Sequence, residues 1–349
     1  MKLLIYSDIH WNTHSSLVRS RGDKYSTRLE HLVASMNWIN EMAEANSCTY
    51  AICAGDFMDK IQLTDEELTA LQDIQWSDKV RHYFLCGNHE SSVSDLRYSS
   101  IKALEAPNRT IIDKLTTLKT LYYDILFIPY IVESDRLDLE HYIKKGEITR
   151  TKDKPFIIIS HNDMAGINYA GFESKLGFHV KEIAESCDLY LNGHLHNSEY
   201  ITKNILNVGS SMAHNFTNNS AMYKYGIWIL DTATLDLQFI ENPFGFSFYK
   251  FEILDSSDLA ALTKIKNNAV LSIRCVESLI SEVKNALDDL KEKILESRLT
   301  VIKQYEQETG SEISISALQS DHLGKFIDFC KANINNSQIL DAELAEICK

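Results

Sequence analysis

The chain has 349 residues, of which 44% are hydrophobic and 24% are charged, so its composition is that of a folded globular protein with room for about two domains. Its net charge of −14 argues against a protein that coats nucleic acid with a uniformly basic surface, which leaves only local basic patches for such binding. Seven cysteines without C-x-x-C spacing indicate reduced thiols rather than a disulfide framework or a zinc ribbon.

No apolar run has the length of a membrane span. The longest, 125–132, is short and contains a proline, and Asp8 interrupts the first apolar segment before it could serve as the core of a signal peptide. We therefore expect no membrane segment and a cytoplasmic location, which would be the host cytoplasm if the source is a virus.

Up to about residue 241, short apolar runs alternate with amphipathic stretches. Thr27 with Glu30 and Thr64 with Glu67 have the spacing of capping boxes, and each pair predicts the start of a helix. Two further runs, 225–230 and 235–240, would close the sheet system. Five runs have the length and composition of buried strands, namely 3–6, 50–54, 83–86, 156–159 and 189–191. This alternation predicts an α/β layered fold.

The pattern changes after Pro243. The segments 246–251 and 270–273 are predicted strands, and apolar residues from Leu279 to Ile294 form a stripe at helical spacing on one long helix, which we expect to be a packed face. We therefore expect a main domain over 1–243, a small α+β domain over 244–310 and a helical tail over 311–349.

Each of the five predicted strands is followed by residues that can bind a metal ion. The carboxyl ends of strands in an open α/β sheet form a ligand crevice, so these side chains should converge on one site. A lone histidine is usually structural, but that explanation would have to apply at all five strand ends. The residues are Asp8, His10, Asp56, Asn88, His161, His194 and His196.

This set of donors points to a particular kind of metal centre. Two aspartates, one asparagine and four histidines contain too much nitrogen for magnesium or calcium and no thiolate, which fits manganese, iron or zinc. Seven ligands exceed the need of one catalytic ion with open positions, so two ions that share a carboxylate are the economical interpretation. Such a pair binds a phosphoryl oxygen and lowers the pKa of a bound water, which predicts phosphoester hydrolysis.

Five motifs in this order resemble the signature of the calcineurin-like metallophosphoesterases. They are D-x-H at 8–10, G-D at 55–56, G-N-H-E at 87–90, a strand-terminal histidine at 161 and G-H-x-H at 193–196. The resemblance implies a layered sandwich in which Asp56 bridges two ions. It assigns the first ion to Asp8, His10, Asp56 and His196, and the second to Asp56, Asn88, His161 and His194. It also implies that His89 is a catalytic residue outside the ligand set, oriented by Glu90.

The motif spacing, the Gly209-Ser210 pair and the extra domain after Pro243 resemble the DNA-repair nuclease branch of that family, which includes the SbcD type and a phage recombination endonuclease subunit. The branch implies an exonuclease or endonuclease that attacks phosphodiester bonds with a metal-bound hydroxide, with Mn2+ as the expected ion. It also implies a homodimer and an SMC-like ATPase with coiled-coil arms as partners. Asp59 stands where relatives often have histidine, which leaves the balance of exonuclease and endonuclease action open.

The loop after the first strand is locally basic, with only Asp23 opposing its cations. We expect this loop to contact the phosphates that flank the scissile bond of DNA, without reading its sequence. A solvated charge cluster is an equal alternative for any one of these residues, which are Arg19, Arg21, Lys24 and Arg28.

Two other functions compete with a DNA nuclease. One is a phosphatase or a hydrolase of small phosphodiesters on the same scaffold, and the other is a non-catalytic scaffold subunit, whose mark would be missing ligands. In the tail, an apolar stripe has the pattern of a helix that docks in a groove, either on the ATPase, which we favour, or on the second domain. Its residues are Leu323, Phe326, Ile327 and Cys330.

Overall fold

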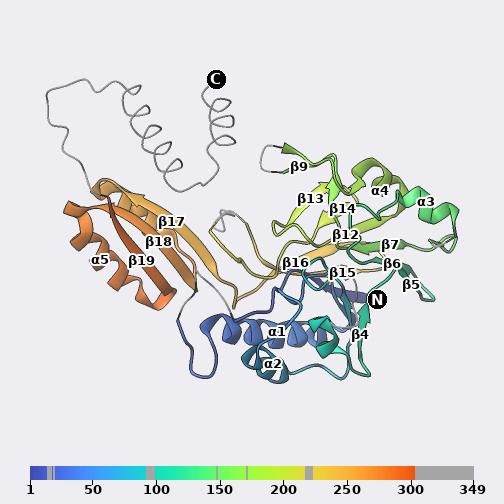
Figure 1. Cartoon of the computed structure of the whole chain (residues 1–349), viewed down its shortest axis with the longest axis horizontal. Helices are drawn as coiled ribbons and strands as arrows, with labels where there is room; N and C mark the ends of the chain where they lie inside the picture. The colour runs from blue at the N-terminus through green and yellow to red at the C-terminus, as the bar shows by residue number, and fades with distance from the viewer. Residues whose placement is uncertain are drawn as a thin grey trace, which may run out of the picture. The chain divides into compact units, whose positions relative to one another are not determined.

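The computed structural model describes residues 1–302 except 14–17, 19, 92–98, 147, 170–171 and 217–222 (Figure 1). Met1–Ile302 form one compact unit. The predicted tail helix lies outside the described residues, and the expected domain boundaries at 243 and 310 stay predictions. Among the helices of the described residues, none has the length and apolar content required to cross a membrane.

The first six-stranded sheet has the order β16-β15-β1-β2-β3-β4. Its four strands from β1 to β4 are parallel, and β15 and β16 extend it in antiparallel fashion, as the closing strands were expected to do. The strands are β1 (Lys2–Tyr6), β2 (Cys48–Cys53), β3 (Arg81–Leu85), β4 (Arg109–Ile112), β15 (Gly226–Asp231) and β16 (Leu237–Glu241). Helices α1 (Thr27–Ala45) and α2 (Asp65–Gln72) and the 3-10 helix η2 (Ser100–Leu104) lie in its crossover connections.

The second six-stranded sheet has the order β13-β14-β12-β7-β6-β5, with antiparallel strands at both edges. Its strands are β5 (Thr116–Lys119), β6 (Asp124–Ile128), β7 (Phe156–Ser160), β12 (Leu189–Asn192), β13 (Glu199–Thr202) and β14 (Ile205–Asn207). Helices α3 (Leu139–Lys144) and α4 (Val180–Ser186) belong to this half. Two short ribbons pair β8 (Met164–Ala165) with β11 (Phe178–His179) and β9 (Asn168–Tyr169) with β10 (Phe172–Glu173).

The two sheets pack face to face, and helices cover their outer faces. Leu3 and Ile52 of the first sheet share one apolar cluster with Ile157 and Leu206 of the second. A second cluster joins the outer face of the first sheet to α1 and α2, and a third joins the outer face of the second sheet to α3 and α4. Because both faces of the central strands are buried, those strands are continuous apolar runs. The expected α/β sandwich is confirmed.

Only one of the two predicted capping boxes has the expected residues. In α1 the cap is Ser26 rather than Thr27, and the Glu30 carboxylate accepts from the backbone N–H of Lys24 at 2.7 Å. In α2 the box is formed as predicted, since the Thr64 hydroxyl accepts from the N–H of Glu67 and the Glu67 carboxylate accepts from the N–H of Thr64.

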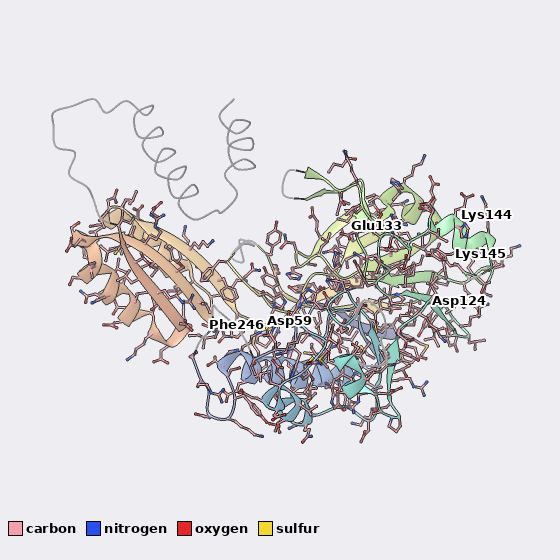
Figure 2. All side chains as sticks on the ribbon, in the orientation of Figure 1. Asp59, Asp124, Glu133, Lys144, Lys145 and Phe246 are labelled. Carbon is pink, nitrogen blue, oxygen red and sulfur yellow. The ribbon has the colours of Figure 1, made fainter. Side chains whose placement is uncertain are left out.

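A third sheet of three parallel strands follows Pro243 and has its own apolar cluster. Phe246, which leads into this sheet, lies with its ring 4.8 Å from that of His31 in α1 (Figure 2). The strands are β17 (Ser247–Ile253), β18 (Ala269–Val276) and β19 (Ile294–Ile302). Between them lie η3 (Ser256–Lys264), η4 (Glu277–Leu279), α5 (Ile280–Asp289) and η5 (Lys291–Lys293).

The prediction of one long helix through Ile294 was wrong. Helix α5 ends at Asp289, and Ile294 begins β19, where it pairs with Ala269 of β18. The apolar spacing before Leu290 is helical, but pairing with β18 imposes the strand conformation beyond it. The stripe therefore combines a helix face with the first residue of a strand.

His82 of β3 provides a pH-dependent contribution to stability. The side chain is fully buried, with its ring 5.2 Å from that of Trp76, and burial together with nearby Arg109 lowers the pKa of His82 to about 4. In the unfolded chain this group titrates near its ordinary pKa, so between the two values the unfolded state binds a proton that the folded state does not. We expect this group to lower the free energy of unfolding by about 2 kcal/mol between pH 7 and pH 5.

Urea unfolding of metal-free protein at pH 7 and pH 5 measures this effect. The His82→Phe variant has no titrating group at this position and should lose less stability over the same interval than the wild type. An equal loss in both proteins would assign the acid sensitivity to other groups.

Candidate metal centre

The seven predicted ligands lie together, although the strands that carry them belong to two different sheets. Strands β1, β2 and β3 are in the first sheet and β7 and β12 are in the second. The convergence expected from the carboxyl ends of strands in an open sheet is found here where the carboxyl ends of two packed sheets meet. Convergence is preserved because both sheets present these ends at the same edge of the sandwich.

The first group contains Asp8, His10, Asp56 and His196. The Nε2 atom of His10 is 3.1 Å from Nε2 of His196. The same Nε2 atom is 3.9 Å from Oδ1 of Asp8 and 3.9 Å from Oδ2 of Asp56. Nε2 of His196 is also 3.9 Å from Oδ1 of Asp8. Two imidazole nitrogens and two carboxylates thus face one another across a few ångströms.

The second group contains Asp56, Asn88, His161 and His194. Nε2 of His161 is 3.2 Å from Oδ2 of Asp56 and 3.1 Å from Oδ1 of Asn88. The same amide oxygen of Asn88 is 3.0 Å from Nδ1 of His194. Because Oδ2 of Asp56 also faces His10, this carboxylate lies between the two groups, at the place that a bridging ligand would take. The ligand roles themselves stay predictions.

Outer partners hold three of the histidines by the ring nitrogen that does not face the ligand groups. In metal sites such contacts fix the tautomer and direct the other nitrogen toward the ion. The pairs are Nδ1 of His10 with Oδ1 of Asp59 at 3.0 Å, Nδ1 of His161 with the carbonyl of Ala54 at 2.8 Å, and Nε2 of His194 with Oδ1 of Asp163 at 3.2 Å. The sequence analysis did not assign Asp59 or Asp163 to the site; the only signal for Asp163 is its place two residues after His161.

Backbone strain is concentrated in the same loops. Four non-glycine residues of the site have left-handed φ angles: Asp8 at 52°, His10 at 49°, Asp56 at 49° and His194 at 75°. This conformation is unfavourable for residues with a Cβ and persists where the surrounding structure enforces it, most often at functional sites. The loops are thus held in costly conformations that direct these side chains inward.

Two glycines allow the loops to approach so closely. A Cβ atom at Gly55, where φ is 106°, would collide with the ring of His161, and one at Gly87 would collide with the carboxylate of Asp56. Any larger residue at either position would displace a predicted ligand. The G-D and G-N-H-E motifs therefore require glycine for steric reasons.

The buried carboxylate and imidazole of the second group influence each other's protonation. Burial favours neutral Asp56, but the charges of His161 and His10 outweigh burial and lower the pKa of Asp56 below its ordinary value. Burial opposes a charge on His161, yet Asp56 raises the pKa of His161 to about 10. In the metal-free protein a proton on His161 therefore offsets the carboxylate charge. Metal binding would have to displace that proton, because only neutral imidazole coordinates.

The residues present fit a pair of divalent ions. Oδ1 of Asp8 is buried and has no hydrogen-bond partner among the described residues, an arrangement that is costly unless a cation compensates it. The mixed nitrogen and oxygen donors suit a first-row transition metal. Ions held by these two groups would supply positive charge for a phosphoryl oxygen and a water of lowered pKa.

Glu90 does not orient His89 as expected. Its carboxylate is buried and accepts from the N–H groups of Met58 at 2.8 Å and Gly87 at 2.7 Å, so it fixes the two loops instead. Burial and the charge of Asp56 raise the pKa of Glu90 to about 8. His89 is held by Asp59, whose carbonyl accepts from Nδ1 at 3.0 Å and whose carboxylate Oδ1 lies 3.6 Å away. Tight turns direct the glutamate side chain back under its own loop.

The basic loop has acidic partners that its local sequence does not show. Arg21 pairs with Glu66 at 2.8 Å and Lys24 pairs with Asp73 at 2.6 Å. Arg19 lies outside the described residues. The expected DNA contacts of Arg19, Arg21 and Lys24 stay predictions.

The position of Arg28 contradicts the expectation that this residue contacts DNA. It is only 3% exposed, and its guanidinium donates to Oδ1 of Asn12 at 2.8 Å and to the carbonyl of His10 at 3.0 Å. Burial lowers the pKa of Arg28 to about 10, so it stays charged at neutral pH. The residue lies in the first turn of α1, on the face that packs beneath the metal centre, where its charge offsets the clustered carboxylates.

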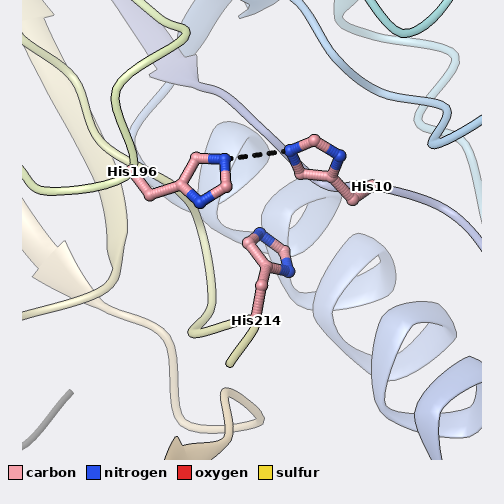
Figure 3. A group of neighbouring side chains, drawn as sticks. All are labelled: His10, His196 and His214. Carbon is pink, nitrogen blue, oxygen red and sulfur yellow. Dashed lines mark hydrogen bonds between the residues drawn. The ribbon is translucent and has the colours of Figure 1, made fainter. Parts of the chain in front are cut away.

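His214 is a neighbour of the site that the sequence analysis missed (Figure 3). Its ring lies 4.8 Å from that of His10 and 5.0 Å from that of His196. Nδ1 is 3.3 Å from the Arg28 guanidinium, which can only donate, so Nε2 carries the proton and donates to the carbonyl of Asp8 at 2.8 Å. Both nitrogens are thus engaged, and His214 supports the loop rather than offering a free ligand atom.

Arg28→Met is expected to weaken metal binding by the first group roughly tenfold, because partners of ligand loops contribute this much to affinity. Manganese titration followed by electron paramagnetic resonance measures the effect. Arg21→Met, which removes an exposed arginine of the same segment, is the matched control and should bind metal normally. Wild-type metal affinity combined with weaker DNA binding in Arg28→Met would contradict this prediction and support the expected contact of Arg28 with DNA.

The sandwich and its two groups of predicted metal ligands are the features of a metallophosphoesterase. The sequence model of the calcineurin-like phosphoesterase family matches residues 1–198, more than half of the chain, and the chain belongs to this family of metal-dependent phosphoesterases. The matched segment includes all seven predicted ligands.

Among the solved structures that are similar to this chain are two of low sequence identity. One, from "Structural and Functional Characterization of a Novel Archaeal Phosphodiesterase", is 15% identical with a TM-score of 0.35, over 69% of this chain and 99% of that one. The other, the TT1561 protein of Thermus thermophilus, is 12% identical with a TM-score of 0.41, over 69% of this chain and 98% of that one. Scores this low add nothing to the family assignment. No curated protein matches the sequence.

Proposed function

We propose that this protein is a two-metal DNA nuclease of the recombination and repair type that uses Mn2+. The observation that carries the hydrolytic part is the convergence of all seven predicted ligands on two adjoining groups that share Asp56. The DNA part is supported by the order of the motifs, by Gly209-Ser210 and by the additional sheet after Pro243, which together resemble the DNA-repair branch.

The chain's own residues divide the work of such a reaction. Asp8, Asp56 and His161 form a buried floor, whereas His89 stands at the rim with 39% of its side chain exposed. The Asp59 carbonyl fixes Nδ1 of His89, and no described residue hydrogen-bonds Nε2. When both ring nitrogens of His89 are protonated, Nε2 can therefore give its proton to the leaving oxygen of a phosphodiester that approaches from solvent.

The proposal includes the partners that the resemblance implies. The protein would act in the cytoplasm as a homodimer together with an SMC-like ATPase. The sequence contains no Walker-type loop, which supports an external source of any ATP dependence. The tail that would bind the ATPase lies outside the described residues. Co-purification of the two chains, with and without residues 313–349, tests this part.

A hydrolase of small phosphodiesters is the second candidate, favoured by a specific observation. Arg28 is buried, and Arg21 and Lys24 already pair with acidic residues, so the basic loop offers less positive charge to DNA than its sequence indicates. A small substrate would not need such a surface.

Activity assays separate the candidates. The purified protein is incubated with Mn2+ and with single-stranded DNA, double-stranded DNA, bis-p-nitrophenyl phosphate or p-nitrophenyl phosphate, and Asp56→Asn prepared in parallel controls for contaminating nucleases. A DNA nuclease cleaves DNA and also hydrolyses the aryl diester. Hydrolysis of the aryl diester without DNA cleavage would indicate the small-molecule enzyme, and hydrolysis of the monoester alone a phosphatase. No hydrolysis at all would indicate a scaffold.

A further inference from the structure

A second surface feature lies next to the metal centre, on the side where β13 of one sheet faces β15 and β16 of the other. It is a groove of about 350 Å³, called here the aromatic groove. The residues that line it are Ser198, Tyr223, Lys224, Trp228 and Phe239. Tyr200 of β13 adjoins it, with its ring 6.0 Å from that of Trp228.

The fold holds these rings in place. Trp228 and Phe239 are cross-strand partners in the β15–β16 pair, with ring centroids 5.1 Å apart. The indole N–H of Trp228 donates to the carbonyl of Val208 at 3.2 Å, which fixes the ring at the rim of the core between the sheets. Tyr200 stands over this rim with half of its surface exposed. The result is a preformed, partly exposed aromatic surface.

A short segment of the chain connects the aromatic groove to the metal centre. Ser198, which lines the groove, comes two residues after His196 of the first ligand group. Two residues span at most about 7 Å, so Ser198 lies within about this distance of His196 along the backbone. A strand whose phosphate lies at the metal centre can therefore place a neighbouring base in the groove.

The charge of the groove also suits a nucleic acid strand. Lys224 is exposed and forms no ion pair with the residues that the structure describes. One acidic neighbour is Asp236, whose charge adds to burial in raising the pKa of Tyr200, so it acts at the Tyr200 end. Glu199 follows Ser198 in the chain, and Glu241 of β16 pairs with Lys266 at 2.6 Å. Aromatic rings beside a cation are the arrangement that stacks bases and pairs with the intervening phosphates of single strands.

We propose that the aromatic groove binds unpaired bases of a single-stranded DNA substrate next to the scissile phosphate, with Lys224 at a backbone phosphate. This inference rests on the proposed function and gives it a substrate form. Duplex bases stack on one another and cannot enter the groove, so single strands should bind better than duplexes of the same length.

Binding to metal-free protein in EDTA tests the proposal without any contribution from catalysis. Fluorescence anisotropy of a labelled oligothymidylate gives the Kd. Tyr200→Ala should weaken binding roughly tenfold, whereas Tyr200→Phe, which keeps the ring, should bind like the wild type. The matched control is Tyr122→Ala, which removes another exposed tyrosine (63% exposed) from the turn between β5 and β6 and should have no effect.

Lys224→Gln tests the phosphate contact, because removal of one such contact lowers the slope of log K against log salt by about one. All of these variants should hydrolyse bis-p-nitrophenyl phosphate at the wild-type rate, which shows that the metal centre is intact. If Tyr200→Ala and Lys224→Gln both bind DNA with unchanged affinity while the wild type binds and cleaves DNA, the proposal that the groove binds bases is wrong, and the proposed nuclease function is unaffected. A wild type that binds no DNA but hydrolyses the aryl diester would instead overturn the proposed function, and the groove proposal with it.

Discussion

Asp56→Asn is expected to remove most of the hydrolytic activity, by at least ~10³-fold, because it weakens both metal sites at once. Oδ2 of Asp56 lies 3.2 Å from Nε2 of His161 and 3.9 Å from Nε2 of His10, so one carboxylate serves both ligand groups. Asparagine keeps the shape of the side chain but removes the negative charge that offsets two cations.

Metal content per chain after dialysis against dilute Mn2+ is the direct measurement, and it should fall below one ion in Asp56→Asn. Asp163→Asn is the matched control, since this carboxylate is 38% exposed and, among the described residues, hydrogen-bonds only to His194 on its outer side, so it should lower metal affinity far less. In metal-free Asp56→Asn the pKa of His161, followed by NMR, should fall from its raised value because its main stabilising charge is lost. Two ions retained at wild-type affinity would contradict the bridging role.

Much of the site was predictable because strand ends are local signals. A buried strand is a short apolar run, and the polar residue that follows it lies at the end of that strand whatever the neighbouring strands do. Asp8 after β1 and His161 after β7 could therefore be assigned to one edge before their partners were known. The assignment holds for a sandwich as well as for one open sheet, because two packed sheets present their carboxyl ends at the same edge as one open sheet would.

Side-chain direction was not predictable in the same way. Glu90 directs its carboxylate under its own loop and Arg28 directs its guanidinium under the metal centre, although both are charged residues in polar segments. These directions depend on left-handed φ angles and on the face of α1 that packs against the sheet, which are set by distant parts of the chain. His214, 204 residues after His10, gave no sequence signal because nothing near it repeats or pairs.

The acidic partners of the basic loop illustrate the same limit. Glu66 and Asp73 lie more than 40 residues from Arg21 and Lys24, in and just after α2, so a local count of charges overestimates the free positive charge. The aromatic groove was missed for a related reason, since its rings come from β13, β15 and β16 and from the segment before β15. Surface sites assembled from several elements require the tertiary structure.

His89→Gln is expected to lower the turnover of DNA by roughly 10² to 10⁴, the contribution of a general acid or base, with little change in metal content or DNA affinity. The ring of His89 lies 4.7 Å from that of His10, but its Nδ1 is held by the Asp59 carbonyl, so the side chain adjoins the first ligand group without joining it. Glutamine keeps the polarity of the side chain and cannot carry the proton.

The leaving group decides which role His89 has. The alkoxide that leaves from DNA needs a proton, whereas p-nitrophenolate is stable without one, so a proton donor matters for DNA and hardly for bis-p-nitrophenyl phosphate. If His89 donates the proton, His89→Gln should lose most of its activity on DNA and little on the aryl diester, and an equal loss on both would indicate stabilisation of charge at phosphorus instead. Since His10, Asp59 and His89 could themselves hold an ion, loss of metal from the variant would contradict both roles and make His89 a ligand.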